Sequence, residues 1–133
     1  MQRISKSVFA LLSALVLTTF VGCASIEVAK NAQGTGQKKI YRAPLEKVWV
    51  AIPKAIAQTG GDIEESDKTQ CSVLAEYGVT WFSWGERVGV FCYRISESET
   101  EVEVVSKRAF AAGTIPLWST SKIFNALDNE LRP

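Results

Sequence analysis

Apolar residues recur at intervals of three and four in two parts of the chain, which is the spacing of an amphipathic helix. The first set is Leu45, Val48, Trp49, Ile52, Ala55 and Ile56. It predicts a helix from Pro44 to about Gly60, with a kink or restart just before Pro53, because proline removes a backbone donor. The second set is Ile123, Phe124, Leu127 and Leu131. It predicts a closing helix that begins at Ser119 or Ser121, whose hydroxyls suit a helix start.

Five short segments have the composition or alternation of β-strands. They are residues 39–42, 61–65, 71–77, 87–95 and 101–106. The last segment alternates glutamate with valine, as a strand does when one face lies in the core and the other in water. The resulting order is β-α-β-β-β-β-α. It predicts an α+β fold, in which an antiparallel sheet of four to five strands carries two helices on one face.

The N-terminal 22 residues have the pattern of an export signal. Arg3 and Lys6 precede an uncharged, apolar-rich run over residues 8–21, and Gly22 and Cys23 follow it. A positive start, an apolar run and small residues at a cleavage point define a secretory signal. The run is shorter than the about 20 residues that a helix needs to cross a bilayer. We therefore expect a leader that is removed rather than a retained transmembrane anchor.

The sequence Phe20-Val21-Gly22-Cys23 resembles the lipobox of bacterial lipoprotein precursors, with Phe20 where leucine is usual. The resemblance covers about the first 24 residues. It implies that the Cys23 sulfur receives a diacylglycerol, that the leader is cut before Cys23, and that the new amine is acylated with a fatty acid such as palmitate. Two or three acyl chains anchor a protein stably in a membrane. Ala24 replaces the aspartate that retains enteric lipoproteins at the inner membrane, so the resemblance implies the outer membrane, facing the periplasm.

Ordinary signal cleavage after Ala24, which would discard Cys23, is the alternative. Removal of residues 1–22 leaves 111 of the 133 residues, enough for one domain. Residues 23–37 are small and polar with no sustained period, which predicts a flexible tether. Within it, Gly34-Thr35-Gly36 lacks the Gly-Lys-Ser/Thr of a phosphate loop, which favours a linker. Residues 38–133 then form a single α+β domain.

The composition argues against catalysis. The chain has no histidine, which removes the usual general base, the Ser-His and Cys-His nucleophile pairs, and the favoured zinc ligand. Its 15 basic residues are scattered and nearly balance 14 acidic residues, which argues against a nucleic-acid partner. We expect no enzymatic activity, no cofactor and no metal. The acidic residues of the second predicted strand are expected to form a solvated sheet edge; they are Asp62, Glu64, Glu65 and Asp67.

Cys71 and Cys92 lie in two successive predicted strands. A hairpin register that pairs Gly78 with Gly85 also places Cys71 opposite Cys92. Cross-strand neighbours lie close to disulfide distance, and the periplasm is oxidising. We predict a disulfide, with two buried free thiols as the alternative. The absence of Cys-x-x-Cys spacing argues against a redox role.

Two predicted connections between elements are rich in aromatic residues. Connections normally lie on the surface, so these residues predict an exposed apolar patch that could dock a protein, lipid or cell-wall partner. The patch would contain Trp81, Phe82, Trp84, Phe110 and Trp118. In the alternative interpretation, the run from Phe110 to Trp118 folds back as a lid over the core, with Pro116 fixing its turn.

The order of elements and the helix start at Ala43, Pro44, Val48 and Trp49 resemble the small domains of the non-barrel lipoprotein subunits of outer-membrane assembly machinery. This implies a membrane-anchored, non-enzymatic module for protein interaction or assembly support, with a protein partner in the envelope. The helix start is also similar to that of helix-grip domains, which would imply a small apolar-ligand carrier. Such a carrier predicts a cavity between the first helix and the sheet, lined by Trp49, Ile52, Phe91 and Tyr93. A filled core there would favour the interaction module.

Overall fold

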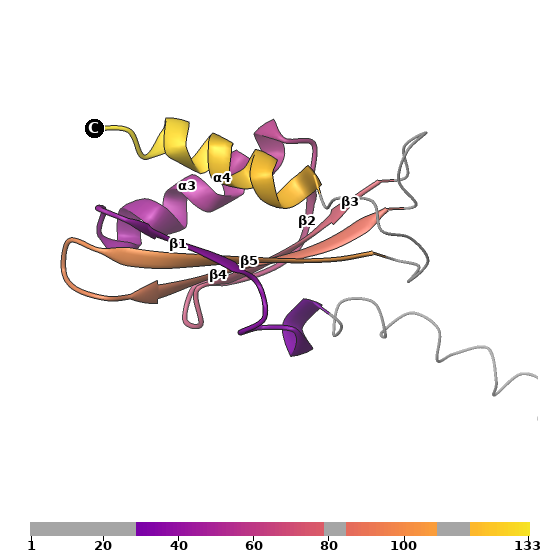
Figure 1. Ribbon diagram of the computed structural model, residues 1–133, viewed down its shortest axis with the longest axis horizontal. Coiled ribbons are helices and arrows are strands. Elements are labelled where there is room, and N and C mark those ends of the chain that lie inside the picture. The colour runs from indigo at the N-terminus through magenta and orange to yellow at the C-terminus, as the bar shows by residue number, and fades with distance from the viewer. Residues whose placement is uncertain (1–28, 79–84, 109–117) are drawn as a thin grey trace, which may run out of the picture.

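The computed structural model describes residues 29–78, 85–108 and 118–133. The elements in chain order are β1 (Gln37–Tyr41), α3 (Leu45–Gln58), β2 (Asp62–Asp67), β3 (Ser72–Tyr77), β4 (Glu86–Arg94), β5 (Thr100–Arg108) and α4 (Trp118–Glu130). The strands form one antiparallel sheet in the order β1-β5-β4-β3-β2. Both helices cover the same face of this sheet (Figure 1), which we call the helix face. The predicted α+β fold and its order of elements are confirmed, with five strands.

The main core lies between the helix face and the two helices. Alternation along each strand points every second side chain toward α3 and α4. The side chains buried there with at most about one per cent of their surface exposed include Val48, Ile52, Ile56, Val73, Val88, Val90, Val102, Val104, Ile123 and Leu127. Each such burial stabilises the fold by about 1.5–3 kcal/mol. These residues fill the space between α3 and the sheet.

Helix α3 begins after Pro44, whose carbonyl accepts hydrogen bonds from the amides of Lys47 (3.0 Å) and Val48 (3.1 Å). Pro44 is the N-cap, with an extended backbone (φ −65°, ψ 153°), and the first helical residue is Leu45 rather than the predicted Pro44. Pro53 lies inside α3, which continues to Gln58. Of the kink or restart that we expected just before Pro53, the restart is therefore wrong and the kink stays a prediction. The buried side chains on both sides of Pro53 hold the helix on the sheet and offset the missing hydrogen bond.

The β3–β4 hairpin has the register that the sequence predicts. Ser72 lies opposite Phe91 and Tyr77 lies opposite Glu86. The same symmetry places Cys71 opposite Cys92. The connection over residues 79–84 lies outside the described residues.

The opposite face of the sheet, which we call the second face, is covered in part by residues 29–36, the N-terminal strap. The strap lies on the side of the sheet away from α3 and α4 (Figure 1). Ala29 and Ala32 are buried in a second apolar cluster against the strands, together with Leu74, Phe91 and Val105. We expected residues 23–37 to be a flexible tether, but from Ala29 onward this segment is packed on the sheet, and Gln37 begins β1.

Phe91 and Tyr93 belong to the second face. Phe91 lies in the second cluster and Tyr93 packs against it, whereas the alternating residues Val90 and Cys92 lie in the main core. The prediction that Phe91 and Tyr93 line a cavity under the first helix is therefore wrong. Both faces of β4 are covered, and its residues from Val88 to Tyr93 are all apolar or glycine, so the sequence does not show which of these side chains point toward the helices.

Candidate functional site

The strap is fastened to the second face by the carboxylate of Glu103, on β5. Its Oε1 atom accepts hydrogen bonds from the backbone amides of Gly34 (2.7 Å) and Gly36 (2.8 Å). Its Oε2 atom accepts a hydrogen bond from the Tyr93 hydroxyl (2.9 Å). Glu103 is 0% exposed. We expected the glutamates of this strand to face water; for Glu103 this is wrong, because the strap supplies the donors that replace water.

The glycines of the strap permit this contact. Gly34 has φ of +94°, which favours glycine over residues with a Cβ. A Cβ on Gly36 would lie 2.5 Å from the carbonyl oxygen of Val104, so only glycine lets the backbone pass this close to β5. Two nearby amides that converge on one oxygen make an anion-binding backbone concavity. In this chain the anion is the carboxylate of Glu103 itself.

Further polar contacts surround the strap. The Gln33 side-chain amide donates to the Tyr93 hydroxyl (2.8 Å), and the Lys38 ammonium lies 5.6 Å from the centre of the Tyr93 ring. Lys38 pairs with Glu101 (3.2 Å), whose hydrogen bond raises the pKa of Lys38. At the other end of the strap, Lys30 pairs with Glu65 of β2 (3.3 Å). Solvent-accessible pairs of this kind contribute little to stability, so Glu103 is the main polar attachment of the strap.

Cys71 and Cys92 form the predicted pair. Their Cα atoms are 5.3 Å apart, a normal disulfide separation, and the structure joins them as a disulfide. The Cys71 carbonyl also accepts a hydrogen bond from the Cys92 amide (2.9 Å). Both residues are buried in the main core. Cys71 closes the turn between β2 and β3 with φ of +48°, a left-handed conformation that is uncommon for a residue with a side chain.

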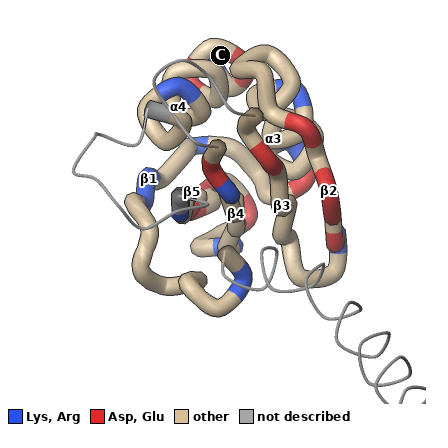
Figure 2. Tube along the Cα trace, turned by 90° about the vertical axis from the view of Figure 1, so that its right-hand side faces the viewer, with Lys and Arg blue, Asp and Glu red and all other residues tan. Residues whose placement is uncertain are grey.

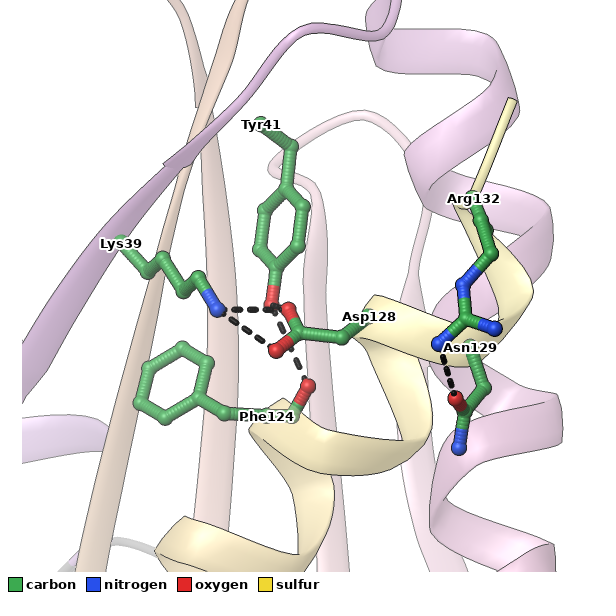
Figure 3. A network of polar contacts seen from close by, with 6 residues as sticks. All are labelled: Lys39, Tyr41, Phe124, Asp128, Asn129 and Arg132. Atoms are coloured by element: carbon green, nitrogen blue, oxygen red, sulfur yellow. Dashed lines mark hydrogen bonds and ion pairs between the residues drawn. The ribbon is translucent and has the colours of Figure 1, made fainter.

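A polar network joins the two ends of the described chain (Figure 3). The Asp128 carboxylate on α4 accepts hydrogen bonds from the Lys39 ammonium (2.6 and 2.7 Å) and from the Tyr41 hydroxyl (3.0 Å), both on β1. The Tyr41 hydroxyl also lies 3.4 Å from the Phe124 carbonyl. Burial, followed by the hydrogen bond to Asp128, raises the pKa of Tyr41. The network therefore fixes edge strand β1 against α4.

This network predicts a loss of stability at high pH. The pKa of Tyr41 in the folded protein lies above its ordinary value of 10.0. The stabilisation that the neutral Tyr41 hydroxyl provides is therefore complete below about pH 10. It is lost at higher pH, because Tyr41 ionises in the unfolded chain before it ionises in the folded protein. We expect the free energy of unfolding to fall between about pH 8 and about pH 11, and to fall less in Tyr41→Phe. Urea unfolding of both proteins at both pH values measures this; equal falls would contradict the assignment to Tyr41.

A second buried carboxylate lies between the sheet and the first turn of α4. Glu86 of β4 accepts hydrogen bonds from the hydroxyls of Ser106 (2.9 Å) and Ser119, and all three residues are buried. The two hydroxyls are themselves 3.1 Å apart. Because the chain contains no histidine, neither hydroxyl has the usual base that would make it a nucleophile. The cluster attaches the first turn of α4 to β4 and β5.

The acidic strand β2 lies at an edge of the sheet, as predicted. Figure 2 shows acidic positions along this strand. Asp62, Glu64 and Glu65 are exposed, and Asp67 is partly exposed. Charged side chains on an exposed edge discourage the addition of a further strand. In the part of the chain that the structure describes, no three potential metal-ligating side chains come together.

The remaining predicted site residues lie outside the described residues. They are the lipidation candidate Cys23 and the patch residues Trp81, Phe82, Trp84 and Phe110. Trp118 is the first residue of α4, although its side chain is not described. Among the described helices, none is long and apolar enough to cross a membrane. The apolar patch and the lipid anchor therefore stay predictions.

Comparison with known proteins identifies the fold. No family model and no curated protein sequence matches this chain. The structure is similar to a chain in the crystal structure of the adenylate sensor from AMP-activated protein kinase, in complex with 5-aminoimidazole-4-carboxamide ribofuranotide. The TM-score is 0.55 at 8% sequence identity, and the match covers 68% of this chain and 94% of the other. At this identity, the similarity shows a shared α+β fold and nothing about ligands.

Proposed function

We propose that this chain is a lipid-anchored protein of the bacterial cell envelope, without enzymatic activity, whose domain serves protein interaction or assembly support. Residues 1–22 are the leader and Cys23 is the lipidated first residue of the mature chain. The outer membrane, facing the periplasm, is the favoured location, and the partner is another envelope protein. The resemblance of the leader to a lipobox supports the anchor.

The cysteine pair carries the assignment to an exported compartment. Cys71 and Cys92 are 21 residues apart in sequence, yet they lie at disulfide distance in the main core. Disulfides form and persist in the periplasm and are rare in the bacterial cytosol. This pair therefore supports export independently of the leader sequence.

The packing under α3 supports an interaction module over a ligand carrier. Val48, Ile52 and Ile56 on the inner side of α3 are 0% exposed and lie in one cluster with the sheet valines. A carrier of helix-grip type needs an apolar cavity at this place. In addition, Phe91 and Tyr93, two of the four residues expected to line such a cavity, lie on the second face.

The mass of the mature protein tests this proposal. We expect the membrane-extracted protein to begin at Cys23, to carry added acyl mass, and to resist thiol alkylation until it is reduced. The matched variant Cys23→Ser should lose the acyl mass and leave the membrane fraction, because its hydroxyl is not the thiol that receives the lipid. Loss of residues 1–24 without any lipid would contradict the anchor. Alkylation of two thiols without reductant would instead contradict the disulfide and leave the anchor standing.

A further inference from the structure

The strap determines how far the domain can lie from its anchor. Only residues 24–28 separate Cys23 from Ala29, the first described residue, which is 1% exposed. A fully extended chain spans at most about 3.3–3.6 Å per residue, so Ala29 can lie no more than about 20 Å from Cys23. If the strap were free, Gln37 would be the first residue attached to the sheet. The domain could then lie up to about 50 Å from Cys23.

The strap contacts are strong enough to make it part of the domain. The Glu103 carboxylate receives two strap amides in a fully buried position, and Ala29 and Ala32 pack on the second face. Hydrogen bonds to a charged group stabilise a fold more than hydrogen bonds between neutral groups do. The shorter of the two distance limits, the one between Cys23 and Ala29, therefore applies to the folded protein. The chain that leads to Cys23 leaves the domain from the second face.

The rest of the second face suits a neutral lipid surface. Among its cations, Lys30, Lys38 and Arg87 are each paired with a glutamate, while Lys107 of β5 is exposed. Ile40 of β1 alternates with the core residue Tyr41, so it lies on the second face, where it is 57% exposed. Ion-paired side chains attract anionic lipid weakly. We therefore expect the second face to contact the lipid surface because the tether holds it close and because an apolar side chain can be buried there.

We infer that the anchored domain lies with its second face toward the phospholipid surface, held there by the strap, and that the helix face with α3 and α4 points away from the membrane. The inference rests on the proposed lipid anchor and adds an orientation to it. The helix face is then the surface that an envelope partner reaches. Glu103 acts as a positioning residue, because it holds the strap that sets the distance.

Paramagnetic relaxation tests this orientation. The isotope-labelled mature protein is placed in phosphatidylcholine nanodiscs that carry a gadolinium-chelating headgroup lipid. We expect the amides of Lys38, Ile40 and Glu65 to relax severalfold faster than those of Asn129 and Arg132, near the end of α4. Equal relaxation on the two faces, or faster relaxation on α4, would overturn the inference.

Two variants test the role of the strap. Ten Gly/Ser residues inserted after Val28 should reduce the relaxation of the second-face amides severalfold, because the reach from Cys23 more than doubles. Glu103→Ala should do the same by releasing the strap, while Glu101→Ala, on the same strand and face, should keep the wild-type pattern. Unchanged relaxation in the insertion variant would show that the strap does not set the distance.

Failure of the lipid anchor can be distinguished from failure of the orientation. Residues 23–133, produced without the leader and oxidised, are coupled through Cys23 to a maleimide phospholipid in the same nanodiscs. The faster relaxation of the second-face amides should persist in this coupled protein even if the natural chain proves to carry no lipid. Its absence there would overturn the orientation, whatever the mass of the natural protein shows.

Discussion

Glu103→Ala should lower the free energy of unfolding by about 4.5 kcal/mol or more, because three hydrogen bonds to a buried carboxylate are lost at about 1.5–3 kcal/mol each. The amides of Gly34 and Gly36 lose their acceptor, and the Tyr93 hydroxyl keeps only its contact with Gln33. Urea unfolding measures the total effect. Hydrogen exchange measures the local one: we expect protection of the Gly34 and Gly36 amides to disappear while α3 amides stay protected.

Glu101→Ala is the matched control for this prediction. Glu101 lies two residues away on the same strand and face, and its 26% exposed side chain pairs with Lys38 in solvent. Removal of the Glu101 carboxylate should therefore lower the free energy of unfolding only slightly. Glu103→Gln should fall between the two, because the amide oxygen can still accept from the strap. A loss in Glu103→Ala no larger than in Glu101→Ala would show that the strap is not fastened by this carboxylate.

Removal of the Cys71–Cys92 disulfide should lower the free energy of unfolding by about 3 kcal/mol, because the bridge closes a loop of about 22 residues in the unfolded chain. The sequence separation of 21 residues sets this size. Wild-type protein unfolded in urea with and without reductant gives the effect without any change in side chains. Identical midpoints, with two thiols alkylated in both samples, would contradict the bridge.

The left-handed backbone at Cys71 can be separated from the effect of the bridge. Both double variants, Cys71→Ala with Cys92→Ala and Cys71→Gly with Cys92→Ala, lack the disulfide. Because φ at residue 71 is +48°, we expect glycine to be the more stable of the two by about 1 kcal/mol. The same ranking in urea unfolding would confirm that the turn keeps this conformation without the bridge. If alanine were equal or better, the turn would have rearranged.

The sequence predicts the elements and the cysteine pairing well for identifiable reasons. The helical spacing around Val48 and Ile52 and the turn residues between strands are local signals, so the element order follows from them. The register of β3 and β4 follows from hairpin symmetry, which ties Gly78 and Gly85 to the cysteine pair. None of these inferences requires knowledge of distant contacts.

The second face could not be predicted because its structure depends on residues far apart in sequence. Glu103 and Glu101 alternate with valines in the same way, yet one is buried and the other is partly exposed. The difference comes from the strap, whose contact with Glu103 spans 69 residues at Gly34. The strap itself has no helical or strand period. The one available signal was a pair of alanines three residues apart, Ala29 and Ala32, followed by Gly34 and Gly36, a composition that permits close packing as well as flexibility.

The contact between the strap and Glu103 also has a consequence for the order of events during synthesis. Gly34 and Gly36 leave the ribosome 69 and 67 residues before Glu103. Strap docking and the β1–β5 pairing must therefore wait until β5 has been made, because the acceptor does not exist earlier. In that interval residues 29–36 have no buried carboxylate to dock against. The late position of Glu103 thus makes docking of the strap one of the last steps in folding of the domain.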